Sequence, residues 1–168
     1  MKTVAFFGGS FDPPHIGHKA VVKAALNLKD VQKVIVMPTY LSPFKSSSYY
    51  SAHKRYNLLK KMFKDYNDVE ISRFEIDKKE KVASIVSVLH LLKSYSKIYL
   101  IIGADNLTSL QNWHRYQELE QKVTFVIAQR DGILIPKSYL TLDIDEDISS
   151  THIRKKQEQK YCKIELNT

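Results

Sequence analysis

Two histidines spaced three residues apart follow a pair of glycines near the start of the chain. The segment reads Gly8-Gly9-Ser10-Phe11-Asp12-Pro13-Pro14-His15-Ile16-Gly17-His18. Glycines let the backbone come close to a ligand, and their N–H groups can point at phosphate oxygens. A helix that begins near His15 would place both imidazoles on one face of its first turn, where unpaired N–H groups already favour anions. Because imidazoles donate hydrogen bonds, the segment predicts a site for the phosphates of a nucleotide, with Gly17 leaving room for it.

The same two histidines could instead be a metal pair. The sequence around them offers no further ligand at the spacing that a metal site requires. The phosphate interpretation is therefore preferred, and no metal ligand is assigned to a protein side chain.

A second candidate anion site lies near the C-terminus. Ser149, Ser150 and Thr151 precede a basic stretch, and hydroxyl side chains in this position are typical of a helix start. Arg154 would lie one turn into that helix, where its guanidinium could reach back to a phosphate with several donors. Taken alone, the segment fits an ordinary capped helix with an exposed arginine better, since such caps are common.

Further polar residues follow two of the apolar runs. Gly103-Ala104-Asp105 comes directly after the run at 98–102, and Asp105 could accept hydrogen bonds from a ribose or lie beside a cation. Lys45 lies in the segment after the run at 33–37 and could hold a phosphate as a point charge. Trp113 has polar neighbours, which indicates partial exposure, although a single tryptophan is more often a core residue.

The elements that must position these residues alternate along the chain. Short runs rich in branched apolar residues predict strands buried on both faces at 3–7, 33–37, 69–72, 98–102 and 123–128. Apolar residues at helical spacing predict helices at 16–28, 52–66, 82–93 and 113–119. This alternation predicts an α/β fold, a Rossmann-like doubly wound parallel sheet in a three-layer α/β/α arrangement. Ligands of such folds bind at the carboxyl ends of the strands, near the reversal of strand order.

The composition favours one domain without a targeting segment. The chain has 168 residues, of which 43% are hydrophobic, enough for one core. We therefore expect a single domain over 1–168, with a C-terminal helical end from about residue 149. The apolar run at the N-terminus is too short for a signal peptide or a membrane span, and the single cysteine excludes an internal disulfide. These features favour a cytoplasmic protein with no membrane partner.

The net charge of +8 leaves an anionic partner open. The basic residues are spread along the chain without a run of five or more, so a solvated basic surface is the simpler interpretation. A nucleic-acid-binding module is an alternative, but the sequence lacks a basic helix with interleaved aromatic residues. Whether the chain forms a homo-oligomer stays open.

The first segment resembles the first signature of the HxGH nucleotidyltransferases, and it is most similar to that of the bacterial nicotinate-nucleotide adenylyltransferases. Ile148-Ser149-Ser150-Thr151-His152-Ile153-Arg154 resembles the second signature of the same family, in the right order along the chain. The resemblance implies that both histidines contact the ATP phosphates, with His18 nearest the charge at the α-phosphate. It also implies that the second signature binds the β- and γ-phosphates and that the ring of Trp113 stacks on the nicotinate.

The implied reaction is adenylyl transfer from ATP, with Mg²⁺, to nicotinate mononucleotide. The residues expected to act in catalysis are His15, His18, Lys45 and Arg154. Those expected to bind ATP are Gly8, Gly9, Ser10, Phe11, Gly17, Gly103, Asp105, Ser149, Ser150 and Thr151. Those expected to bind the mononucleotide are Asp12, Thr39, Phe44, Ser84 and Trp113. Two segments depart from the family pattern: Phe44 takes the place of a histidine, and 82–85 reads Val-Ala-Ser-Ile instead of Pro-Ser-Tyr-Thr.

Other transferases of the same class are alternatives. Pantetheine-phosphate adenylyltransferases have a similar length and a related first signature, but they typically carry threonine where this chain has His15. They also lack the Gly-Ala-Asp and tryptophan arrangement. A cytidylyltransferase or another small-metabolite nucleotidyltransferase is a further alternative.

Overall fold

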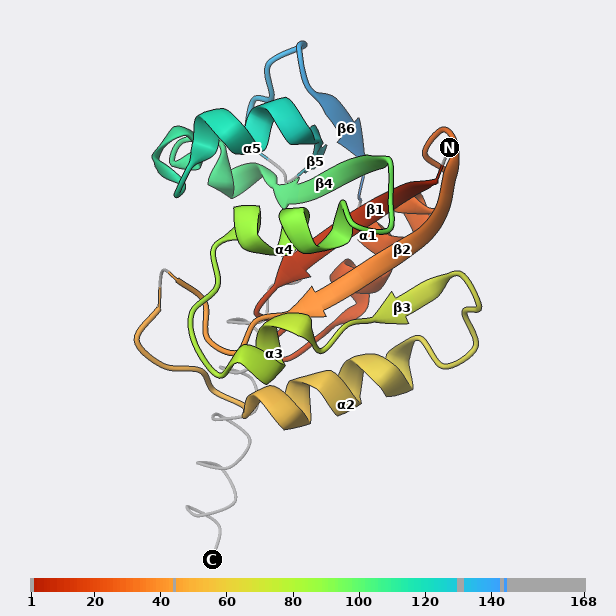
Figure 1. Cartoon of the computed structure of the whole chain (residues 1–168). Helices are drawn as coiled ribbons and strands as arrows, with labels where there is room; N and C mark the ends of the chain where they lie inside the picture. The colour runs from red at the N-terminus through yellow and green to blue at the C-terminus, as the bar shows by residue number, and fades with distance from the viewer. Residues whose placement is uncertain (1, 44, 130–131, 143, 145–168) are drawn as a thin grey trace, which may run out of the picture.

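The computed structural model describes residues 2–43, 45–129, 132–142 and 144, which form a six-stranded sheet covered by helices (Figure 1). The strands are β1 Thr3–Gly9, β2 Val31–Pro38, β3 Val69–Ile71, β4 Lys97–Gly103, β5 Thr124–Ala128 and β6 Leu140–Leu142. The helices are α1 Ile16–Ala25, α2 Ala52–Met62, α3 Phe74–Lys78, α4 Ser84–Leu91 and α5 Tyr116–Lys122, with 3₁₀ turns η1 Ala104–Asn106 and η2 Leu110–Asn112. Phe44, Ser149, Ser150, Thr151, Arg154 and the expected C-terminal helical end lie outside the described residues.

Successive residues of β1 pack on opposite faces of the sheet, as the two-residue period of a strand requires. Val4 and Phe6 belong to a core shared with α4 and α5. Ala5 and Phe7 belong to a second core, shared with α1 and α2. The strand residues are therefore apolar in a continuous run, because both faces are covered. The expected three-layer α/β/α arrangement is confirmed.

All five strand pairs are parallel, and the strand order is β3-β2-β1-β4-β5-β6. The chain goes from β1 to β2 and β3 on one side, then returns to place β4 on the other side of β1 (Figure 1). The expected doubly wound, Rossmann-like topology is confirmed. Strand order reverses between β1 and β4, whose carboxyl ends carry Gly8, Gly9 and Gly103. Ligands of such sheets bind at this reversal.

The prediction missed one short strand and one short α-helix. β6 has three residues, and its Leu-Thr-Leu sequence is too short to show a period. α3 has five residues inside a strongly charged stretch, so it shows no apolar repeat. The helix expected at 113–119 begins only at Tyr116, and Trp113 ends the preceding 3₁₀ turn instead. The remaining predicted strands and helices are present with boundaries shifted by a few residues.

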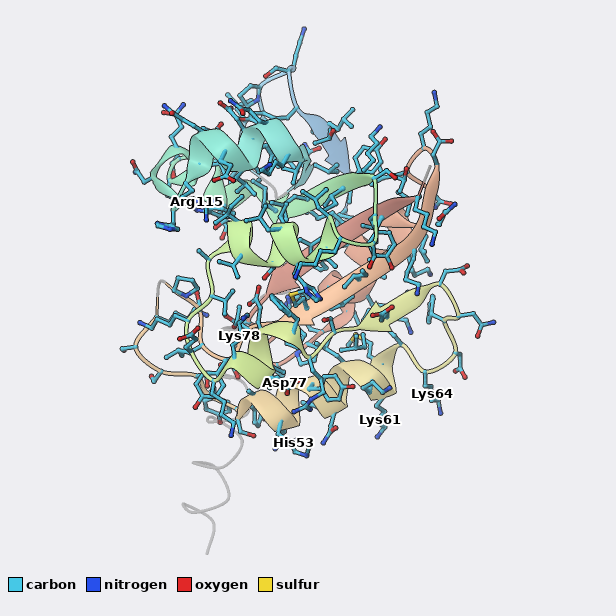
Figure 2. The ribbon with its side chains drawn as sticks, in the orientation of Figure 1. His53, Lys61, Lys64, Asp77, Lys78 and Arg115 are labelled. Atoms are coloured by element: carbon cyan, nitrogen blue, oxygen red, sulfur yellow. The ribbon has the colours of Figure 1, made fainter. Side chains whose placement is uncertain are left out.

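The outer surface carries many of the basic side chains. Figure 2 shows Lys61, at the C-terminal end of α2, and Lys64, in the turn that follows, pointing outward, and both are exposed. Within the part of the chain that the structure describes, no helix has the length and hydropathy needed to cross a membrane.

Candidate active site

A cavity of about 570 Å³ opens at the carboxyl ends of β1 and β4. It is lined by every described residue that the sequence singled out as catalytic or ligand-binding. These residues are Gly8, Gly9, Ser10, Phe11, Asp12, His15, Gly17, His18, Thr39, Lys45, Ser84, Gly103, Asp105 and Trp113. Segments that are up to about a hundred positions apart in the sequence therefore meet in one place, at the reversal of strand order.

The two signature histidines cap the first helix. The Gly17 N–H donates to His15 Nδ1 at 3.0 Å, and the His15 N–H donates to His18 Nδ1 at 3.1 Å. The two rings stack with their centroids 3.8 Å apart. Because each Nδ1 accepts a hydrogen bond, the neutral rings carry their proton on Nε2. Each imidazole therefore presents Nε2 as the nitrogen that can donate to a phosphate oxygen.

The capping role of His15 gives a stability prediction. We expect His15→Ala to lower the free energy of unfolding by about 1 kcal/mol, the usual cost of removing an N-cap acceptor. We expect His15→Asn to restore most of that loss, because asparagine is among the best N-cap residues. Urea denaturation of the two variants and the wild-type protein measures the difference. Equal losses in both variants would show that the cap contributes nothing.

Phe11 turns the chain between the glycines and the helix. It has a φ of 48°, in the left-handed region, which costs a non-glycine residue roughly 1 kcal/mol. Its side chain is 3% exposed and makes edge contacts with Phe7 and His18, at centroid distances of 5.1 and 4.8 Å. This packing offsets the backbone strain and fixes the turn that lines the cavity.

Asp12 joins two loops that line the cavity. Its carboxylate accepts the backbone N–H of Tyr49 at 2.6 Å and that of Tyr50 at 2.7 Å. The side chain is 3% exposed. Asp12 was expected to bind the mononucleotide, and that role stays a prediction. What the structure shows is a carboxylate that ties the first loop to the segment before α2.

Arg55, on α2, is a residue of this region that the sequence interpretation missed. It is fully buried, and its guanidinium donates to the carbonyl oxygens of Ser10, Tyr40 and Tyr50. Burial lowers the pKa of this guanidinium, and the nearby Asp12 carboxylate opposes that shift. A sequence signal did exist, because Arg55 lies four positions before the buried Leu59, on the same face of the helix.

Glu75, on α3, also lines the cavity and was also missed. Its side chain is 4% exposed, and Oε1 accepts a hydrogen bond from the Ser87 hydroxyl at 2.6 Å. Among the described residues, Oε2 is buried without a hydrogen-bond partner. Burial raises the pKa of this carboxyl to about 7, and the bond from Ser87 opposes the rise. The partner lies twelve positions away, so no local pattern could have indicated the pair.

Gly103 ends β4 beside the Asp105 side chain, which would have to move if Gly103 carried a Cβ. A Cβ at this position would lie 2.6 Å from Oδ1 of Asp105. The expected close approach of a ligand to the backbone of Gly103 stays a prediction. Asp105 is exposed and lines the cavity. Trp113 is half-buried against the core beneath α4 and α5, as the polarity of its neighbours had indicated.

Comparison with known proteins identifies the family. The family model described as Cytidylyltransferase-like matches residues 6–156. A Sulfurimonas denitrificans protein named "Probable nicotinate-nucleotide adenylyltransferase" is 51% identical over 92% of this chain and 85% of its own length. The chain belongs to the nicotinate-nucleotide adenylyltransferase family. A relative of the same name from a Nitratiruptor species is 46% identical over 94% of this chain and 90% of its own length.

Solved structures of nicotinate-nucleotide adenylyltransferases share the fold. A Plasmodium falciparum nicotinic acid mononucleotide adenylyltransferase complexed with NaAD superposes with a TM-score of 0.75 at 20% identity. The match covers 92% of this chain and 83% of that one. A nicotinate-nucleotide adenylyltransferase from Vibrio parahaemolyticus, itself described as putative, superposes with a TM-score of 0.68 at 23% identity, over 92% of this chain and 86% of that one.

Proposed function

We propose that the protein transfers the adenylyl group of ATP to nicotinate mononucleotide, giving nicotinate adenine dinucleotide and pyrophosphate, a step of NAD biosynthesis. The observation that carries the proposal is the meeting of His15, His18 and Lys45 with Ser84 and Trp113 around one cavity. The first three residues suit a triphosphate, and the last two suit a pyridine mononucleotide. The family of the chain supports the same substrates.

The chemistry requires alignment and charge stabilisation. A phosphate oxygen of the mononucleotide attacks the α-phosphorus of ATP in line, and the bond from that phosphorus to the β-phosphate oxygen breaks. The attacking phosphate is already ionised at neutral pH, so no general base is needed. Pyrophosphate leaves with the electron pair and must be stabilised as an anion. Hydrogen bonds from Nε2 of His15 and His18, together with the charge of Lys45, supply this stabilisation in the proposed mechanism.

Magnesium enters the proposal as a partner of ATP. Among the residues that the structure describes, no three acidic, histidine or cysteine side chains lie close enough together to hold a metal ion. In the proposal the ion arrives bound to the ATP phosphates, where it would neutralise part of their charge. Arg154 and the hydroxyls of Ser149, Ser150 and Thr151 remain proposed contacts of the β- and γ-phosphates.

A pyrophosphate-release assay tests the function. ATP and Mg²⁺ are supplied with nicotinate mononucleotide, nicotinamide mononucleotide or phosphopantetheine, and with no acceptor as the control. We expect release with nicotinate mononucleotide at the highest kcat/KM. Faster release with phosphopantetheine would assign the chain to a different acceptor, and no release with any of the three would refute the proposed activity.

A further inference from the structure

Arg55 is not among the residues that line the cavity. It nevertheless contacts two segments that do line it, the loop of Ser10 and the segment that begins near Tyr40. We propose that Arg55 is a positioning residue, which holds the Gly8–Asp12 loop and the 39–50 segment at the separation that lets His18 and Lys45 act on one nucleotide. The inference rests on the proposed adenylyl transfer.

Three hydrogen bonds carry this inference. The Arg55 guanidinium donates to Ser10 O at 2.7 Å, in the first loop. It donates to Tyr40 O at 2.8 Å and to Tyr50 O at 3.1 Å, near the two ends of the second segment. Between those two carbonyls lie Ser42 and Lys45, which line the cavity. One side chain therefore sets where this segment begins and ends relative to Ser10.

Asp12 holds the same segment from the other loop. Its two oxygens accept the N–H groups of Tyr49 and Tyr50, and Arg55 binds the carbonyl of Tyr50. The peptide groups on both sides of Tyr50 are thus fixed, one by a carboxylate and the other by a guanidinium. The nearby opposite charge also compensates the burial of Arg55, because an uncompensated buried cation would be strongly destabilising.

The chemistry of the contacts requires arginine. Three carbonyls in different directions are satisfied by the planar fork of a guanidinium, through Nε, Nη1 and Nη2. A lysine at this position keeps the charge but offers a single ammonium group on a flexible stem, which cannot span the same three acceptors. Arg55→Lys therefore removes the positioning function while it retains most of the volume and the charge.

The first test is a double-mutant cycle between Arg55→Lys and Lys45→Ala, read as kcat/KM for ATP in the pyrophosphate assay. A misplaced group in a transfer site commonly costs up to about 10²-fold, so we expect Arg55→Lys alone to lose about 10- to 100-fold. Because Arg55 acts partly through the segment that carries Lys45, the two losses of kcat/KM should not multiply.

Arg73→Ala is the matched control, since Arg73 is a partly exposed arginine paired with Asp77 on α3. Its effect should be small and independent of Lys45→Ala.

The second test is backbone hydrogen exchange, which needs no activity and so separates this inference from the proposed function. In Arg55→Lys we expect faster exchange at 8–12 and 39–50 and unchanged exchange in β4 and β5.

A third test is chemical rescue. Added guanidinium ion should restore activity to Arg55→Ala at concentrations that leave Arg73→Ala unaffected, which would support the same conclusion. Multiplicative losses in the cycle, or a uniform increase of exchange over the whole sheet, would overturn the inference and leave Arg55 a residue of general stability. An inactive wild-type protein whose loops still loosen in Arg55→Lys would refute the function alone.

Discussion

His18→Ala is expected to lower kcat by about 10²- to 10³-fold, the usual effect of removing one donor that stabilises developing charge. His18 lines the cavity, and its Nδ1 accepts a hydrogen bond from the His15 backbone, which leaves Nε2 as the donor of the neutral ring. The ring is held by its stack on His15 and its edge contact with Phe11. Because the donor is already oriented, its loss should affect turnover more than substrate affinity. Steady-state kinetics with ATP and nicotinate mononucleotide measure the effect.

His53→Ala is the matched control for this experiment. His53 is exposed on α2, where its ring contacts the Asn57 side chain, and Figure 2 shows it at the outer surface. We expect its turnover to equal that of the wild-type protein. Circular dichroism should show that both variants remain folded. His18→Ala should have a slightly lower free energy of unfolding, because one capping hydrogen bond is removed. Near-normal turnover of a folded His18→Ala would refute the role assigned to this histidine.

Glu75→Gln is expected to stabilise the protein at pH 8.5 and to leave its stability at pH 4 unchanged. The pKa of Glu75 rises from 4.5 to about 7 in the folded protein. Below pH 4.5 the carboxyl is protonated in both the folded and the unfolded states. Between pH 4.5 and 7 the unfolded chain loses the proton and the folded chain keeps it, so the free energy of unfolding falls as the pH rises. Above pH 7 the loss is complete, and at about 1.4 kcal/mol per pKa unit it amounts to roughly 3 kcal/mol.

Glutamine removes this penalty because it is neutral at every pH and its oxygen can still accept the Ser87 hydrogen bond. Urea denaturation at pH 4 and pH 8.5 measures the expected gain. Glu80→Gln is the control, since Glu80 is exposed in the segment that follows α3. Equal effects of Glu75→Gln at the two pH values would show that the carboxyl is not held neutral by burial.

Most of the fold could be predicted because the strands are buried on both faces. A continuous apolar run such as 98–102 is visible in the sequence, and it corresponds to β4, whose residues Ile98 to Ile102 are all buried. β6 and α3 could not be predicted in the same way. Each is shorter than about two periods of its own pattern, so tertiary contacts and not local sequence define it.

The residues of the site could be predicted where they are contiguous in sequence. They could not be predicted where their burial depends on hydrogen bonds to residues far away in the sequence. The loop from Gly8 to His18 carries its own pattern of glycines, prolines and histidines. Arg55 lies at helical spacing before Leu59 and Glu75 has no such pattern, but charged residues usually lie on the surface, so neither was expected to be buried. What makes them buried is the set of partners, 12 positions away for Glu75 and up to 45 for Arg55. Those partners are assembled only by the fold.

The return of the chain across β1 gives the two walls of the cavity separate origins. The wall that carries His15, His18 and Lys45 comes from the first two crossovers, whereas Ser84 begins α4 and Trp113 follows β4. Substitutions in the second wall leave the sequence of the segments that form the first wall unchanged. A protein engineer can therefore vary the residues of one wall by changing one part of the chain and leave the sequence of the other part as it is.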